Sequence, residues 1–277
     1  MTRLAYLGPP GTFSEEAALR YQPSAELLPL STEAAVVAAV DSGEADEGVL
    51  AIENSIEGSV TRTLDALIHE SELSIRHELI LPIEHCLIVR PGMAAAAVSA
   101  IYAHPQALNQ CRKFLDRCFP DARQEAALSN SAAVEETMGR EGSAAIGTGR
   151  AAQIYGAEVL ARGIQDRNPN VTRFVILARE DHPRTGDDKT SFACAFAVED
   201  RPGLLVGALE EFSQRSINLS KIESRPSRER LGTYIFLMDI DGHRADSVVA
   251  EALKCVKERC SFFRVLGSYP RYREPAA

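Results

Sequence analysis

The chain has 277 residues, of which 45% are hydrophobic and 25% charged, a length and composition that predict a sizeable core and two domains or more. Its net charge of -9 argues against nucleic acid as the main partner, although a local cluster of hydrogen-bond donors can still bind a small anion. The six cysteines are scattered, which suits free thiols in a reducing compartment. The chain begins with a strand-like run rather than a signal peptide, and no apolar stretch reaches the ~20 residues of a membrane span. We therefore expect a cytoplasmic protein.

Residues 1–180 alternate strand-like and helix-like segments, which predicts an α/β fold. We expect strands over residues 4–7 and 48–52, and helices over residues 14–21, with Ser14 as the cap, 32–42 and 59–70. A strand-like run over residues 73–89, interrupted by Pro82, carries the chain into a second lobe at about residues 80–160. In that lobe we expect strands over residues 100–103 and 144–146, and helices over residues 106–118, 131–139 and 150–155.

Residues 181–189 are polar and contain proline and glycine, which is typical of a linker. After this linker we expect a second domain over residues 190–268. Its elements are predicted over residues 190–198, 204–215, 217–224, 233–240, 245–258 and 262–267, in the order β-α-β-β-α-β. That order matches the ferredoxin-like α+β arrangement.

Thr172 and Arg173 lie where a loop, marked by Pro169, meets the apolar run over residues 175–178, which we interpret as a buried strand. Such junctions are common positions for chemistry in α/β folds. Arg173 has the geometry to hold a carboxylate through two parallel hydrogen bonds, and Thr172 can donate a hydrogen bond to a departing oxygen. The alternative is a solvated surface arginine beside a turn.

Four junctions in this region are rich in glycine, serine, threonine or asparagine: residues 8–14, 53–59, 129–131 and 147–149. Since helix N-termini bind anions, junctions that face one another across two lobes would form a cleft for a small polyanion. The alternative is that each polar side chain only caps its own helix.

Glu53 and Asn54 directly follow a predicted buried strand, where a carboxylate can serve as an acid, a base or an orienting group, or else form an ion pair at a helix entry. Gln110 lies one helical turn after Gln106 and can point into the same cleft. The positions of His69, His77 and His85 do not have the spacing of metal ligands.

The chain resembles the prephenate dehydratase family, which makes phenylpyruvate in phenylalanine biosynthesis. The resemblance rests on residues 8–14 (GPPGTFS), 52–60 (IENSIEGSV), 104–108 (HPQAL) and 170–174 (NVTRF). Residues 203–206 (GLLV) and 223–226 (ESRP) resemble the phenylalanine-sensing motifs of an ACT domain. The resemblance implies a two-lobed α/β catalytic region, similar to type II periplasmic binding proteins, and an ACT domain that binds phenylalanine at the interface of a homodimer or homotetramer. It also implies a monofunctional, allosteric lyase under feedback control, with no metal or organic cofactor.

The resemblance also assigns residues to three groups of sites. The catalytic group is Thr172, Glu53 and Asn54, and the substrate-binding group is Arg173, Phe174, Thr12, Ser14, Ser55, Gln110 and Ser131. The effector-binding group is Gly203, Leu204, Leu205, Val206, Asn218, Leu219, Glu223, Ser224, Arg225 and Pro226, of which the last four are alternatively a segment that transmits the change.

The expected reaction removes a ring hydroxyl as water and a carboxylate as carbon dioxide, and a group that donates a hydrogen bond to the departing hydroxyl suffices for catalysis. We expect Thr172 to be that donor, in a relay with Glu53, while Arg173 and helix N-termini hold the remaining carboxylate. The chain departs from the family pattern at Ala103, at Leu128 and at residues 147–149, so we expect its second-lobe contacts to differ from those of relatives. The alternatives are an arogenate dehydratase and a non-catalytic protein that senses amino acids.

Overall fold

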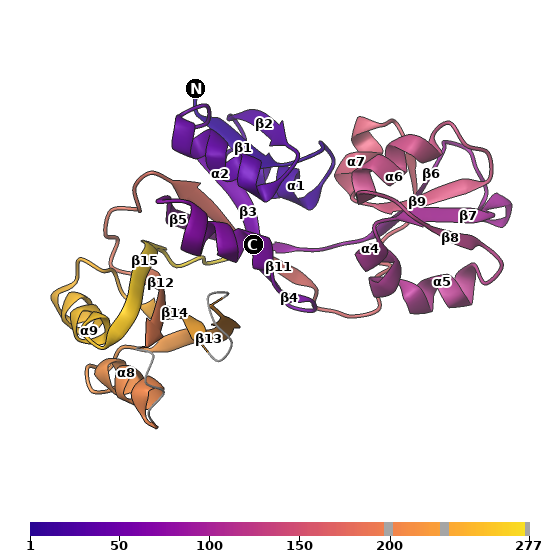
Figure 1. Ribbon diagram of the computed structural model, residues 1–277. Helices are drawn as coiled ribbons and strands as arrows, with labels where there is room; N and C mark the ends of the chain where they lie inside the picture. The colour runs from indigo at the N-terminus through magenta and orange to yellow at the C-terminus, as the bar shows by residue number, and fades with distance from the viewer. Residues whose placement is uncertain (197–201, 228–232, 275–277) are drawn as a thin grey trace.

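The first lobe is a mixed sheet whose centre carries the strands that lead to the candidate site. The computed structural model describes residues 1–196, 202–227 and 233–274, and within these ranges the strands form three sheets (Figure 1). The strands of the first sheet are β1 (Arg3–Leu7), β2 (Glu26–Leu30), β3 (Glu47–Asn54), β4 (Gly58–Ser59), β5 (Ser74–Pro82) and β11 (Val171–Ala178). They are arranged in the order β2-β1-β3-β11-β5, with β4 paired to β3, and β11 runs antiparallel to both of its neighbours. Its helices are α1 (Phe13–Tyr21), α2 (Glu33–Ser42) and α3 (Thr61–Asp65), the last continued by a π-helix, Ala66–Glu70.

The second lobe is inserted between β5 and β11, so the chain crosses between the lobes twice (Figure 1). Its strands are β6 (Cys86–Val89), β7 (Ala100–Ala103), β8 (Arg123–Ala126), β9 (Ser143–Gly147) and β10 (Glu158–Ala161), in the order β10-β6-β9-β7-β8. Its helices are α4 (Pro105–Gln110), α5 (Arg112–Cys118), α6 (Asn130–Thr137) and α7 (Gly149–Ile154), with a short 3-10 turn at Ala95–Ala97. The two-lobed α/β architecture expected from the sequence is therefore present.

The third sheet belongs to the C-terminal domain, whose elements follow the predicted order β-α-β-β-α-β. They are β12 (Asp188–Phe196), α8 (Leu204–Ser213), β13 (Leu219–Pro226), β14 (Tyr234–Asp241), α9 (Ser247–Lys257) and β15 (Cys260–Pro270). The strands are antiparallel, in the order β13-β14-β12-β15. The predicted end of the first of these strands, at residue 198, lies outside the described residues.

The C-terminal sheet packs on the first lobe and shares a hydrophobic core with it. One buried cluster contains Ile52 and Val175 of the first lobe together with Leu237 and Leu266 of the C-terminal domain. The backbones of β15 and β5 also lie in direct contact: a Cβ atom on Gly267 would lie 2.2 Å from the carbonyl oxygen of Ile75. One side of the sheet that carries β3 and β11 is therefore covered by α2, α3 and the C-terminal domain, whereas α1 packs on the other side.

Most elements match the sequence-based expectations, and the differences have local causes. The helix expected over residues 106–118 is two helices that meet at Cys111, and the cap of α1 is Thr12, not Ser14, since its hydroxyl accepts the Glu15 N–H. Strands β2, β8 and β10 were not predicted; all three lie at the edges of their sheets and lack a run of fully buried apolar residues. In the ranges that the structure describes, no helix is long and apolar enough to cross a membrane.

Candidate active site

A cavity of about 210 Å³ lies between the two lobes, beside the crossing strands. The first lobe lines it with Asn54 from β3, Thr172 and Phe174 from β11, and Phe13 and Ser14 from the start of α1. The second lobe lines it with His85, His104, Gln106, Gln110 and Asn130, among others. Asn54, Thr172, Phe174, Ser14 and Gln110, which the sequence singled out from distant segments, are thus brought together in one pocket.

Strand alternation places Thr172 and Arg173 on opposite faces of the sheet. Successive side chains of a strand point to opposite sides, so Thr172 and Phe174 face the pocket and Arg173 faces the C-terminal domain. The register pairs Thr172 with Asn54 and Arg173 with Glu53, so β3 shows the same division.

Asn54 determines which way the hydroxyl of Thr172 can donate. The Asn54 Oδ1 atom accepts the backbone N–H groups of Ile56 at 2.9 Å and Glu57 at 3.0 Å. Its Nδ2 group must therefore be the donor to Thr172 Oγ1, at 2.9 Å. Because Oγ1 is the acceptor in this bond, the hydroxyl hydrogen of Thr172 is available to a molecule in the pocket.

Arg173 is buried in a charged cluster on the other face of the sheet. Its guanidinium donates to Glu78 Oε2 at 2.7 Å, Asp239 Oδ2 at 2.6 Å and the Tyr269 hydroxyl at 2.7 Å. Burial alone would lower the pKa of Arg173, but Tyr269, Asp239 and Glu78 raise this pKa well above its usual value. This geometry corrects the expectation that Arg173 holds a substrate carboxylate, because its donors are occupied on the side away from the pocket.

Glu53 also faces away from the pocket. Its Oε2 atom lies 2.8 Å from Nζ of Lys221 in β13 and 3.9 Å from Nη1 of Arg173. The relay expected between Glu53 and Thr172 is therefore not formed, and the partner of Thr172 is Asn54.

Three other side chains predicted to contact substrate are engaged in holding loops. Thr12 caps α1 and donates to the carbonyl of Leu7, and Ser55 bonds to the backbone of Pro169 and Val171. Ser131 is fully buried and donates to the carbonyl of Pro10 in the opposite lobe. None of these three side chains lines the pocket, which corrects their assignment as substrate ligands.

The departures from the family pattern also have places in the structure. Thr148, in the unusual segment 147–149, caps α7 and donates to the carbonyl of Gly11 at 2.8 Å, so it joins the two lobes. Leu128 is 98% exposed, and Ala103 is fully buried at the end of β7. Neither of these two side chains lines the pocket.

His85, which lines the pocket, and Asn170, which bonds to two lining residues, were assigned no role from the sequence. His85 lies where the chain enters the second lobe, and its Nε2 atom is 2.9 Å from Gln110 Oε1. Burial lowers the pKa of His85, which favours the neutral ring. Asn170 bonds to both Asn54 and Gln110. The sequence signals for these roles are the positions of both residues at the crossings between the lobes and, for Asn170, its place in the NVTRF motif.

The predicted effector residues lie on two sides of the C-terminal domain. Gly203, with φ of 93°, precedes α8, whose first residues are Leu204, Leu205 and Val206. Asn218 and Leu219 lie at the start of β13. Glu223 and Arg225 point the other way, toward the first lobe, where they bond to Ser59 Oγ at 2.5 Å and Asp65 Oδ1 at 2.9 Å. Ser224 and Pro226 alternate with them on the exposed side of the strand.

Comparison with known proteins identifies the family. The prephenate dehydratase family model matches residues 4–182, and the ACT domain model matches residues 195–256. A prephenate dehydratase of Mycolicibacterium vanbaalenii is 42% identical over 98% of this chain and 91% of its own length.

Solved structures agree with this fold. The structure of the prephenate dehydratase from Arthrobacter aurescens in complex with L-Phe is 39% identical, with a TM-score of 0.86 over 97% of this chain and 90% of that one. A structure described as GqqA, a novel type of quorum quenching acylase, is 30% identical, with a TM-score of 0.87 over 98% of each chain. Since the family model covers well over half of the residues and the curated relative matches along nearly its whole length, the chain belongs to the prephenate dehydratase family and carries an ACT domain.

Proposed function

We propose that this chain is a carbon–oxygen lyase that converts prephenate to phenylpyruvate, water and carbon dioxide in the pocket between its lobes. The observation that carries the proposal is the direction of the Asn54–Thr172 hydrogen bond, which leaves the hydroxyl hydrogen of Thr172 free for the substrate. The higher identity to prephenate dehydratases, 42% against 30%, favours this reaction over the acylase activity named for one structural relative.

Thr172 stabilises the departing hydroxyl of prephenate in the proposed mechanism. As the ring carbon–oxygen bond breaks, negative charge grows on that oxygen, and a preorganised donor stabilises it. The carbon–carboxylate bond breaks as well, its electron pair enters the ring, and one proton from solvent completes the water molecule. Asn54 strengthens the donor because a hydroxyl that accepts a hydrogen bond donates a stronger one.

The substrate carboxylates are assigned to backbone donors rather than to cations. None of the lining residues that the structure describes in this pocket is lysine or arginine. The first turns of α1 and α6 reach the pocket through Phe13, Ser14 and Asn130, and helix N-termini favour anions.

For regulation, we propose that phenylalanine binds at the start of α8, between two copies of the chain in a homodimer or homotetramer. The backbone N–H groups of Gly203–Val206 suit its carboxylate, and Asn218 and Leu219 lie at the start of the neighbouring strand β13. Glu223 and Arg225 of the same strand contact the first lobe, so we assign them to transmission of the signal rather than to the effector itself.

The test is to supply purified protein with prephenate and arogenate separately and to follow phenylpyruvate and phenylalanine, with and without added phenylalanine. The Thr172→Val variant, which keeps the shape of the side chain and removes the donor, should lose about 10²-fold or more in kcat. The Thr172→Ser variant keeps the hydroxyl and serves as the matched control. If only arogenate gives product, the substrate is arogenate and not prephenate. Near-normal turnover by Thr172→Val would remove Thr172 from the mechanism.

A further inference from the structure

Four polar residues beside the pocket form a closed ring of hydrogen bonds. The Glu57 backbone N–H donates to Asn54 Oδ1 at 3.0 Å, and Asn54 Nδ2 donates to Asn170 Oδ1 at 2.9 Å. Asn170 Nδ2 then donates to Gln110 Oε1 at 3.0 Å, and Gln110 Nε2 donates to Glu57 Oε1 at 3.0 Å. The last bond returns to the residue where the ring began.

The direction of every bond in this ring is fixed by groups that have only one option. A backbone N–H can only donate, which makes Asn54 Oδ1 an acceptor, and a carboxylate can only accept, which makes Gln110 Nε2 a donor. Asn170 lies between a donor and an acceptor, so its amide has one possible orientation. All bonds therefore run in the same sense, and each bond polarises the next through the amides of Asn54, Asn170 and Gln110.

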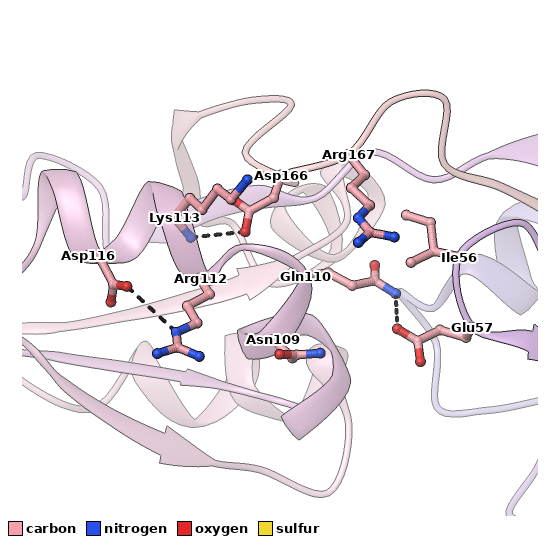
Figure 2. Close-up of a pocket in the computed structure, with 9 residues that line it drawn as sticks. All are labelled: Ile56, Glu57, Asn109, Gln110, Arg112, Lys113, Asp116, Asp166 and Arg167. Carbon is pink, nitrogen blue, oxygen red and sulfur yellow. Dashed lines mark hydrogen bonds and ion pairs between the residues drawn. The ribbon is translucent and has the colours of Figure 1, made fainter.

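The ring joins both lobes and includes a residue of the second crossing of the chain. Gln110 ends α4 in the second lobe, while Glu57 belongs to the loop between β3 and β4 in the first, and Figure 2 shows the two side chains bonded to each other. Asn170 directly precedes β11, the strand that returns to the first lobe. Gln110 lines the inner pocket and also the outer pocket of about 630 Å³ in Figure 2, so its amide lies between the two.

Two further bonds connect the ring to the chemistry of the pocket. Asn54 Nδ2 also donates to Thr172 Oγ1, and because Gln110 Oε1 can only accept, we assign the His85 Nε2 atom, 2.9 Å away, as its donor. Loss of the Gln110 bonds would leave the amide of Asn170 free to turn. The Asn170 oxygen, which now accepts from Asn54, would then no longer be fixed.

We propose that Glu57, Gln110 and Asn170 are positioning residues for Thr172, because their ring holds the amide of Asn54 that donates to Thr172. This inference rests on the proposed dehydratase function. It also reassigns Gln110 from substrate ligand to positioning residue, because its carbonyl accepts from two protein groups and its amide donates to a third.

The test compares Glu57→Ala with Glu57→Gln in prephenate turnover. Glu57→Ala removes the acceptor of Gln110 and should lower kcat about tenfold with little change in KM, the scale of one hydrogen bond to a charged group. Glu57→Gln offers a neutral acceptor at the same place and should recover most of this loss. In a Thr172→Val background, Glu57→Ala should cost less than twofold more, because the ring acts through Thr172.

These measurements test the positioning role separately from the stability of the variants. An additive loss in the Thr172→Val background, or a change in KM alone, would overturn the positioning role. Thermal unfolding of each variant separates a kinetic effect from a loss of folded protein. Absence of turnover by the unaltered chain would instead refute the proposed function.

A second pair of variants tests the same bond by exchanging the carboxylate and the amide between Glu57 and Gln110. Gln110→Glu places two carboxylates at the position of the present 3.0 Å contact and should lower kcat by more than tenfold. Adding Glu57→Gln restores one donor and one acceptor, since the new amide can donate to the new carboxylate, and should recover most of the loss. If the double variant is no more active than Gln110→Glu alone, the contact does not position the donor.

Discussion

The two faces of the β3–β11 pair differ in both chemistry and occupancy. On the pocket face, Asn54 and Thr172 are neutral, and Thr172, which lines the pocket, does not donate its hydroxyl hydrogen to Asn54. On the other face, Glu53 and Arg173 belong to a charged cluster in which Arg173 reaches three partners from two domains. Residues adjacent in sequence are thus divided between the lining of the pocket and attachment of the ACT domain.

This division shows why adjacent residues of one motif need not act on one ligand. A catalytic donor needs an unoccupied hydrogen, whereas a buried cation needs every donor paired, because an unpaired buried charge is strongly unfavourable. Thr172 meets the first condition and Arg173 meets the second. In both strands, therefore, a residue that lines the pocket is the direct neighbour in sequence of a residue that contacts the ACT domain.

The largest expected effect is on the charged face and on stability. Arg173→Met removes the cation that pairs with buried Asp239, while Glu78 keeps its pair with Lys189, and should lower the free energy of unfolding by about 3 kcal/mol, the lower end of the usual cost of breaking a buried pair. Urea unfolding measures this change. Arg140→Met is the matched control, because its pair with Glu136 is exposed and should contribute less than about 1 kcal/mol.

The activity of folded Arg173→Met also tests whether the two faces of the strand pair have separate roles. Since Arg173 does not line the pocket, KM for prephenate should change less than about threefold when activity is expressed per folded molecule. Unchanged stability with a much larger KM would contradict the structure and return Arg173 to the substrate.

The sequence was sufficient for part of this picture. Period-2 alternation alone predicts that Thr172 and Arg173 point to opposite faces, but it does not say which face the second lobe covers. That depends on the docking of the C-terminal sheet, through contacts such as Gly267 with Ile75. The ring could not be predicted either, because Asn54 and Asn170 are 116 positions apart and meet only after both crossings form.

The next effect, on the pocket face, comes from reversing one hydrogen bond. Asn54→Asp keeps the acceptor for the Ile56 and Glu57 N–H groups but replaces the donor to Thr172 with a carboxylate oxygen. The hydroxyl of Thr172 should then donate to this carboxylate and no longer to the substrate. We expect kcat to fall about 10²-fold, the scale of one lost donor to a developing negative charge.

The control for this change is Asn109→Asp, which adds the same charge at an exposed position outside the inner pocket. Turnover by Asn54→Asp within threefold of the unaltered chain would mean that the direction of the Asn54–Thr172 bond does not matter. A comparable loss in Asn109→Asp would point to a general effect of charge.

The smallest expected effect crosses between the two faces. Lys221 of β13 lies 2.8 Å from Glu53 and 3.5 Å from Glu223, so its ammonium joins the residue beside Asn54 to the strand that carries the ESRP motif. Lys221→Met should leave basal kcat within about twofold, because Lys221 touches nothing in the pocket and Glu53 is 39% exposed, which weakens their pair by solvent screening.

What Lys221→Met should change is the response to phenylalanine. If the ACT domain acts on the pocket through β13 and β3, loss of this contact removes part of the coupling, and the ratio of activities with and without phenylalanine should move toward one by about twofold to fivefold. Calorimetry on the full chain should show phenylalanine binding preserved, which separates lost transmission from lost affinity. Lys254→Met in α9 is the matched control. An unchanged response to phenylalanine in Lys221→Met would mean that the coupling runs through another contact. The next contact to break would be the Arg225–Asp65 pair, since it joins the same strand to the first lobe.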